Sequence, residues 1–572
     1  MRTIKKTLML AACLTLLAGV SSAQWPTTVE EHLHVAVGPE TYANHPYTIP
    51  YSADRTFIAF HYYPDTGPTY QIIDRYGRLE YPEPQRIWPG DDPDYWNYWF
   101  AVPDGEGGVF TTKCEPPNLP ELYIKAQRIS SRAELLWGDT GQSVYRYPEN
   151  GTSVELDICQ AGNGTSYIVI AYWDLVSIRP RLYLQRLNSE GEPVWPDSGM
   201  VVSSSPESGY RPCLVGDDQG GCYVIWEDNR WPYSTGALYM QRFDSLGNRL
   251  WEPDSGRFLC AEPWFYQVIP DGENGFILQA NPGGPSYNTV FRISPEGEIL
   301  WSRDHVSWYY WANICSGEPG FFYLTFPYYP GFPFILDEVG IYAQRMDIQG
   351  NTYWPTNWPT EPGAEMAYVE GLNFDTVHSD LHCRYHNGRL FCTYQFYVDN
   401  FHRLPHYLYV QALDINGDKQ FVDIGTLLAV LNEEDGELIR YATVTPDDLG
   451  GVTTVWIHEY DEGFEKDLYA KHVNADGSIG GPSWPPDQQY QPGNPFLSVS
   501  NQTIHYTLSI PGEVSIEIYN VLGRQLSSTS FFHQQAGAFS TPLSTDGLAS
   551  GIYFLRLSTP LGEAVQKVAV VR

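Results

Sequence analysis

The chain has 572 residues, of which 15% are aromatic and 18% are charged, and it contains 51 glycines and 44 prolines. Disordered chains are poor in aromatic residues, so this composition excludes a largely disordered protein and favours short strands joined by many turns. The formal net charge of −34 repels phosphate backbones and argues against nucleic acid as a partner.

The first 23 residues have the three parts of a secretory signal peptide. A basic start is followed by an apolar run from Leu8 to Val20 and by a small-residue cleavage site, Ser21-Ser22-Ala23. The run is short for a membrane span, and no later stretch is apolar enough, so we predict no transmembrane segment after signal removal. Leu10-Ala11-Ala12-Cys13 resembles a lipoprotein cleavage box, but the apolar run continues past it, which favours cleavage near Ala23.

A repeat extends over about residues 50–480. Its first mark is a Gln-Arg pair or a weaker copy, whose first position we call the Gln slot. Gly follows six positions later and an aromatic residue ten positions later, with one exception each, Ala133 and Gly481. A Gly-rich turn precedes most slots, and the slots lie 50 to 67 residues apart. They are Gln71, Gln127, Gln185, Gln241, Phe291, Gln344, Gln411 and Lys471.

The pattern of each unit predicts four strands, and four strands make one blade of a β-propeller. Eight units predict eight blades, or seven if one unit is degenerate, with the recurrent aromatics between blades. Residues 24–52, including 32–37, could supply the strand that closes the ring. Tandem β-sandwich modules are the alternative, but they need about 100 residues each. The region resembles the divergent propeller repeats of exported bacterial proteins, which implies a fold rather than an activity.

Eight cysteines remain once the signal peptide is removed, an even number that is compatible with disulfides in an exported chain. Asn387-Gly388 is typical of a type I′ turn, which places Cys383 opposite Cys392 at a non-hydrogen-bonded position. Cys213 and Cys222 have the same separation around a Gly-rich turn. We predict both disulfides, with buried free thiols as the alternative. The sequence gives no partners for Cys114, Cys159, Cys260 and Cys315.

The sequence has no zinc-protease, nucleophile-elbow or phosphate-loop motif. His378, His382 and His386 have helical spacing for zinc, but the Asn-Gly hairpin puts the last two on a strand, about 13 Å apart. The acidic groups Asp91-Asp92-Asp94 and Glu433-Glu434-Asp435 are interpreted as solvated loops. We therefore predict no catalytic residues, no metal ligands and no cofactor.

Aromatic residues gather in segments that we expect to be loops. Examples are Tyr95-Trp96-Asn97-Tyr98-Trp99, Trp308-Tyr309-Tyr310-Trp311 and Phe326-Pro327-Tyr328-Tyr329. Such rings stack on sugars, but packing between blades is the interpretation that we favour for most of them. A carbohydrate or protein ligand is therefore a possible partner.

Residues 481–493 are predicted to be a linker, and the character of the chain changes after them. Val514 to Tyr519 alternates strictly, which predicts a strand, and Gly551 to Leu557 predicts another. The segment 494–572 contains, in this order, Asn494-Pro495-Phe496, Val514 to Gly523, Leu548 to Tyr553 and a basic-apolar end, Lys567 to Arg572. Through these motifs it resembles the type A C-terminal sorting domain of the bacterial type IX secretion system. A flagellar-hook-capping-like immunoglobulin domain is the structural alternative. The motif residues are Asn494, Pro495, Phe496, Tyr519, Gly523, Gly551, Tyr553, Lys567 and Arg572.

The resemblance implies an immunoglobulin-like β-sandwich that an outer-membrane translocon recognises, and a protein exported through the periplasm that is secreted or held at the outer-membrane surface. The predicted organisation is a signal peptide (1–23), a propeller (24–480), a linker (481–493) and a sorting domain (494–572). We expect the propeller to be a non-enzymatic ligand-binding or structural domain. The alternative is a secreted, glycosidase-like hydrolase with carboxylates at the propeller mouth; partly buried Asp and Glu there would favour the enzyme.

Overall fold

The fold is all-β, and the described residues contain strands and turns but no helix. The computed structural model describes residues 25–37, 43–51, 55–62, 67–91, 99–114, 123–146, 151–174, 179–196, 199–205, 208–230, 236–261, 263, 265–282, 287–308, 312–328, 338–355, 362–370, 374–376, 381–398, 406–431, 437–460, 465–481, 496–500, 503–508, 512–520, 524–534, 537–543, 548, 551–559 and 562–570. The predicted signal peptide and most of the predicted linker lie outside these residues.

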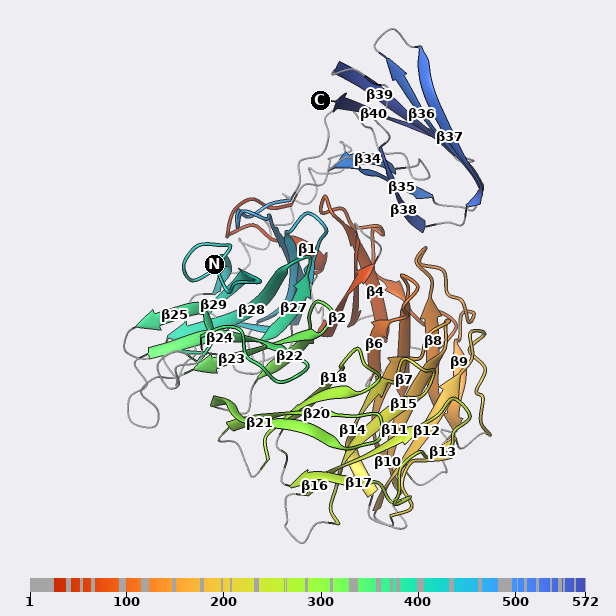
Figure 1. The fold of residues 1–572 in the computed structure, drawn as a ribbon, viewed down its shortest axis with the longest axis vertical. Coiled ribbons are helices and arrows are strands. Elements are labelled where there is room, and N and C mark those ends of the chain that lie inside the picture. The colour runs from red at the N-terminus through yellow and green to blue at the C-terminus, as the bar shows by residue number, and fades with distance from the viewer. Residues whose placement is uncertain are drawn as a thin grey trace.

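Eight antiparallel sheets follow one another in chain order around a ring, which confirms a propeller (Figure 1). The first strand of each blade contacts the first strands of both neighbouring blades, and β31 contacts β2 to close the circle. The first four blades are β2 (Asn44–Tyr51), β3 (Arg55–His61), β4 (Pro68–Asp74) and β5 (Gln85–Arg86); β6 (Trp99–Pro103), β7 (Val109–Cys114), β8 (Tyr123–Ile129) and β9 (Gln142–Arg146); β10 (Gly151–Gln160), β11 (Ser166–Asp174), β12 (Arg179–Leu187) and β13 (Met200–Val201); β14 (Ser208–Gly216), β15 (Cys222–Asp228), β16 (Ala237–Phe243) and β17 (Arg257–Ala261).

The last blade takes its outermost strand from the N-terminal part of the chain. β1 (Leu33–Ala36) pairs antiparallel with β33, with Leu33 opposite Ala470, as the sequence predicted for residues 32–37. In blade 7, β26 and β27 both pair with β28. Blades 5 to 8 are β18 (Tyr266–Pro270), β19 (Phe276–Ala280), β20 (Tyr287–Ile293) and β21 (Ile299–Trp308); β22 (Asn313–Ser316), β23 (Phe321–Tyr328), β24 (Glu338–Asp347) and β25 (Ala364–Glu370); β26 (Phe374–Thr376), β27 (His382–His386), β28 (Arg389–Val398), β29 (His406–Asp414) and β30 (Thr426–Leu431); β31 (Leu438–Pro446), β32 (Val452–Tyr460), β33 (Glu465–Val473) and β1.

The Gln slot is a backbone clamp. In blade 4, the Gln241 amide donates to the Trp251 carbonyl at 3.0 Å, and its oxygen accepts the N–H groups of Arg242 and Trp251. The outer strand leaves the ladder at this point, so its backbone groups need other partners. Blade 5 has Phe291 in the slot because β21 pairs directly with β20 there, with Arg292 opposite Trp301.

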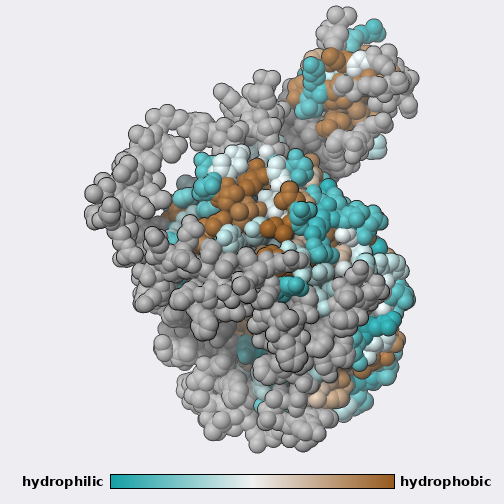
Figure 2. Space-filling model, turned by 90° about the vertical axis from the view of Figure 1, so that its left-hand side faces the viewer, coloured by the Kyte–Doolittle hydropathy of each residue, from teal (hydrophilic) through white to brown (hydrophobic). Residues whose placement is uncertain are grey.

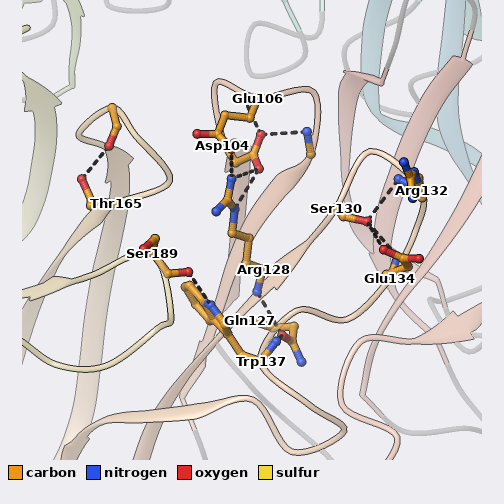
Figure 3. A network of polar contacts seen from close by, with 12 residues as sticks. Asp104, Glu106, Gln127, Arg128, Ser130, Arg132, Glu134, Trp137, Thr165 and Ser189 are labelled. Carbon is orange, nitrogen blue, oxygen red and sulfur yellow. Dashed lines mark hydrogen bonds and ion pairs between the residues drawn. The ribbon is translucent and has the colours of Figure 1, made fainter. Parts of the chain in front are cut away.

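In blades 2, 4 and 5, the Arg that follows the slot holds the Gly-rich turn of its own blade, as Figure 3 shows for Arg128. The Asp104 carboxylate accepts the backbone N–H groups of Glu106 and Gly108 and is paired with Arg128 at 2.9 Å. The same pairing joins Arg242 to Asp217 and Arg292 to Asp271. The two repeated phrases of the sequence are therefore one structural unit.

The aromatic residue ten positions after the slot packs on the next blade. A Cβ on Gly247 would lie 2.9 Å from the indole of Trp195, so only Gly fits beneath the ring. The Trp251 Nε1 group also donates to the Pro295 carbonyl of the next blade, at 3.0 Å. Ala133, the exception among the glycines, has the same left-handed backbone, with φ of 62°.

The last blade has Gly481 where the others have this aromatic residue, and Trp25 takes its place. Trp25 lies against Gly77 and Gly481, and its Nε1 group donates to the Arg75 carbonyl at 2.9 Å. Lys471, in the Gln slot, donates to the carbonyls of Thr28 and Val29 at 2.9 Å each. The N-terminal segment therefore closes the ring through β1, through Trp25 and through Lys471.

The C-terminal strands form a separate two-layer sandwich. One sheet has the order β34-β35-β38 and the other β37-β36-β39-β40, and their facing side chains make one apolar core. This is the predicted β-sandwich. The strands are β34 (Phe496–Ser500), β35 (Thr503–Leu508), β36 (Gly512–Asn520), β37 (Gln525–Gln534), β38 (Gly537–Pro542), β39 (Gly551–Thr559) and β40 (Gly562–Val570).

Candidate functional site

Side chains from the first strands link the blades around the central channel. At equivalent positions of four blades, a side chain accepts a backbone N–H from the first strand of the next blade. The pairs are Asp157 with Leu214 at 2.7 Å, Gln267 with Ile314 at 3.0 Å, Asn313 with Cys383 at 3.2 Å, and His382 with Val444 at 3.2 Å. Arg384 reaches past blade 8 and donates to the Thr48 carbonyl of blade 1. The channel wall is thus tied together by polar side chains.

Burial shifts the pKa values of Asp157 and His382. Removal from water raises the pKa of Asp157 to about 7, although the N–H groups of Leu214 and Ile158 oppose the shift. Removal from water, followed by the charge of Arg384, lowers the pKa of His382 to about 3. Neutral His382 accepts the Val444 N–H through Nδ1. Both residues are therefore held in structural hydrogen bonds.

Arg211 is the exceptional residue of the first strands. It lies near the start of β14, and we call the group that it forms with Glu155, Glu227 and Tyr266 the mouth. It lies where the β14–β15 register shifts, with a left-handed φ of 49°. Glu155 of β10 accepts its backbone N–H, and the Tyr266 hydroxyl of β18 donates to its carbonyl. Blades 3 and 5 thus hold this strained backbone of blade 4 in place, and strain of this kind concentrates at functional sites.

The Arg211 side chain is partly exposed to solvent. Its guanidinium pairs with Glu227, donates to the Pro263 carbonyl at 3.2 Å and lies 5.6 Å from the centre of the Tyr266 ring. The Arg211 side chain is 40% exposed, whereas that of Glu227 is 7% exposed. The mouth therefore offers a planar hydrogen-bond donor that lies over the buried Tyr266 ring, and both glutamates are engaged by Arg211. Tyr441 has the matching left-handed bulge in blade 8, with φ of 53°.

An open groove of about 770 Å³ lies at the outer edge of blades 4 and 5. Arg230 lies 3.9 Å from the centre of the Tyr239 ring and donates to the Ser255 carbonyl. Phe258 and Ile299 also line the groove and are 44% and 48% exposed. The groove is a shallow mixed surface, separate in character from the built mouth.

The cysteine predictions are partly corrected. Cys383 lies opposite Cys392, which confirms the predicted register, but both are free thiols in the structure. The Cys213–Cys222 pairing is wrong in register, since Cys213 faces Ile225 and Cys222 faces Gly216. The turn is centred on residue 219, so the expected partners lie three positions out of step, and both are free thiols.

Among the histidines and acidic groups singled out in the sequence, those that the structure describes do not converge. His382 bonds to the Val444 backbone, and His386 contacts Asp448 at 2.8 Å. Among the described residues, no three His, Cys, Asp or Glu side chains are placed to hold a metal ion. Asp91 is paired with Lys113 and Lys125. His378, Asp92, Asp94 and residues 433–435 lie outside the described residues.

Most of the aromatic segments fall outside the described residues, namely 95–98, 309–311 and Tyr329. Phe326 and Tyr328 are in β23 and are buried, so they pack in the interior rather than forming a loop platform. The sequence pattern did not single out Arg211 or Trp25, although the structure gives each of them a clear role.

The sorting-motif residues are distributed over the sandwich. Tyr553 points into the core, and Tyr519 donates to Glu517, which is paired with Arg556. Phe496 begins β34, Gly551 begins β39 and Lys567 lies on β40 and is exposed. Asn494, Pro495, Gly523 and Arg572 lie outside the described residues. Leu526, Ile552 and Val565 are exposed, and apolar surface on the sandwich is visible in Figure 2.

Comparison with known proteins gives one family match. Residues 494–571 match the secretion system C-terminal sorting domain. No curated protein matches the chain. Within the part of the chain that the structure describes, no helix has the length and apolar character needed to cross a membrane.

Solved structures resemble the chain only in general outline. A crystal structure of the eukaryotic initiation factor has a TM-score of 0.38 at 13% identity, covering 78% of this chain and 89% of that one. An α-L-arabinofuranosidase of Fusarium graminearum has a TM-score of 0.33 at 11% identity, covering 52% and 92%. Oligopeptidase B of Trypanosoma brucei has a TM-score of 0.37 at 10% identity, covering 75% and 54%. Function therefore has to be argued from this chain's own residues.

The predicted sandwich, the ordered motifs and the family match agree on the C-terminal segment. Residues 494–571 form a type IX secretion system C-terminal sorting domain, and the chain is an exported protein of the cell surface or the surrounding medium.

Proposed function

We propose that the propeller is a non-enzymatic binding domain, that residues 1–23 direct its export, and that its mouth binds a neutral oligosaccharide through Arg211. The observation that carries this proposal is the left-handed Arg211 backbone, held by Glu155 and Tyr266 with the guanidinium at the surface. A planar donor that is held in place and partly exposed suits the hydroxyl groups of a sugar. The net charge of −34 disfavours anionic ligands.

The state of the mouth carboxylates supports binding over hydrolysis. A glycosidase needs one carboxyl group as acid and a second as base or nucleophile. Glu227 is paired with Arg211, Glu155 accepts the Arg211 N–H, and Asp157 accepts two backbone N–H groups. All of them have structural partners.

The test is glycan binding by the full chain and by Arg211→Asn. Asn adopts a left-handed backbone readily, so this variant keeps the bulge and removes only the guanidinium. Tyr441→Asn changes the equivalent bulge of blade 8 and is the matched control. On an array of neutral glycans followed by calorimetry, we expect at least about a tenfold loss of affinity for Arg211→Asn alone. Equal binding by both variants, or no neutral glycan bound by the wild type, would contradict the proposal.

The hydrolase alternative rests on Glu155 and Glu227, which flank Arg211 from two blades. It predicts that the wild type releases reducing sugar from a bound glycan and that Glu155→Gln and Glu227→Gln abolish this release. Intact glycan recovered after long incubation with the wild type would exclude it for that glycan.

A further inference from the structure

Three cysteines meet where blade 6 packs against blade 7. Cys315 is on β22, Cys383 on β27 and Cys392 on β28. Cys383 and Cys392 belong to one apolar cluster, and Cys315 packs against it. Cys315 is far from the other two in the sequence, and only the packing of neighbouring blades brings it to them.

The contacts distinguish the two possible partners of Cys383. Its Sγ lies 3.0 Å from Asn313 Oδ1, which is on the same strand as Cys315 and two residues from it, so the Cys383 side chain is directed at blade 6. The Cys392 thiol instead donates to the Thr393 carbonyl at 3.4 Å. Cys392 faces Cys383 across the hairpin, but the Cys392 thiol is directed to the Thr393 carbonyl, whereas the Cys383 thiol is directed to β22 of blade 6.

We propose that Cys315 and Cys383 form a disulfide between blades 6 and 7 in the exported protein, and that Cys392 remains a thiol. The two thiols lose two protons and two electrons, and a disulfide oxidant accepts them and becomes two thiols. Such oxidants belong to the compartments through which exported proteins pass. The proposal concerns the scaffold and is independent of the ligand at the mouth.

A Cys315–Cys383 bond would stabilise the fold more than a Cys383–Cys392 bond. A Cys383–Cys392 bond would close only the hairpin, whereas the Cys315–Cys383 bond closes a loop that contains the outer strands of blade 6, and longer loops restrict the unfolded chain more. Contact with Cys383 and burial raise the pKa of Cys315 well above its usual value. The reactive thiolate is therefore scarce in the folded protein, so the bond forms while the blades assemble and is then protected.

The experiment is peptide mapping of the full chain after secretion through an oxidising periplasm. Free thiols are alkylated in denaturant, and the unreduced digest is analysed by mass spectrometry. We expect one peptide pair joined through Cys315 and Cys383, with Cys392 alkylated. A Cys383–Cys392 peptide, or alkylation of all three cysteines without reduction, would overturn the proposal.

Two matched variants guard against misfolding as an explanation. Cys392→Ser should keep the cross-linked pair, and a reductant should lower its melting temperature as it lowers that of the wild type. Cys315→Ser should lose the pair and the reductant effect. If Cys392→Ser lost the cross-link while keeping its fold by circular dichroism, Cys392 would be the true partner and the proposal would fail.

Discussion

The indole of Trp25 packs against Gly77, in the relationship that Trp195 has with Gly247 inside the ring. The two glycines follow their Gln slots by six positions, but the two tryptophans come from different parts of their repeats. Trp195 is the aromatic residue of its own blade, while Trp25 precedes the first complete blade. The first described residue of the chain therefore completes the last blade.

Trp25→Ala should destabilise the propeller at the seam. Removing a buried indole costs about 3–5 kcal/mol, and here the loss also frees the segment that holds β1. Urea unfolding measures the stability, and limited proteolysis reports release of the N-terminal segment. Trp195→Ala is the control, with a comparable loss of stability but no early cleavage near β1. Equal protease resistance of Trp25→Ala and the wild type would show that the pairing of β1 alone closes the ring.

Gln241→Leu should lower the free energy of unfolding, even though leucine suits the apolar surroundings of the slot. The change leaves the N–H groups of Arg242 and Trp251 and the Trp251 carbonyl without their partner, and each unsatisfied buried group costs about 1–3 kcal/mol. We expect a loss of about 3 kcal/mol or more in the free energy of unfolding. Phe291→Leu, in the slot of blade 5, is the control and should cost about 1.5 kcal/mol or less. Similar losses for the two variants would contradict the clamp.

His382 should make the propeller sensitive to acid. Its pKa is about 3 in the folded chain, against an ordinary value of 6.5 in water, so the unfolded chain binds a proton that the folded chain refuses. The stability contribution is complete above pH 6.5 and is lost as the pH falls towards 3, by at most about 1.4 kcal/mol per pH unit. His382→Gln retains an acceptor for the Val444 N–H and should flatten this part of the profile. A parallel profile for wild type and variant in urea unfolding would rule out a role for His382.

Asp157 should act in the opposite direction. Its pKa is raised from 3.8 to about 7, so the folded chain binds the proton more tightly than the unfolded chain. Stability from this group is present below pH 3.8 and falls as the pH rises to 7. Asp157→Asn should therefore gain on the wild type across this range, by at most about 1.4 kcal/mol per pH unit, and run parallel to it above pH 7. A constant difference from pH 4 to 7 would mean that Asp157 is ionised throughout.

The fold was predictable where local chemistry repeats. The Gln slot, the Gly-rich turn and the aromatic residue each serve the backbone of their own blade or the next, so their spacing is visible in the sequence. The Asn387-Gly388 turn likewise fixed the register of Cys383 and Cys392, because such a turn allows one pairing. The predicted pairing of Cys213 with Cys222 was wrong because the turn between them is centred one and a half positions later than that pairing requires.

The candidate site was not predictable in the same way. Arg211 depends on Glu155 from blade 3 and Tyr266 from blade 5, and nothing in the spacing of these residues shows that they meet. The bulge that holds Arg211 recurs at Tyr441, but the side chains at the two positions have nothing in common. Trp25 did leave one signal, since the last repeat lacks its aromatic residue and has Gly481 instead.

The seam between β1 and β33 also sets the order of events during biosynthesis. A ribosome releases β1 first and its partner hundreds of residues later, so a nascent chain carries an open strand edge throughout elongation. Such edges invite pairing with other chains, and a holdase that masks residues 25–37 would suppress that reaction. The ring closes only when the last blade emerges. Cleavage at the N-terminus has to leave Trp25 in the chain for this closure.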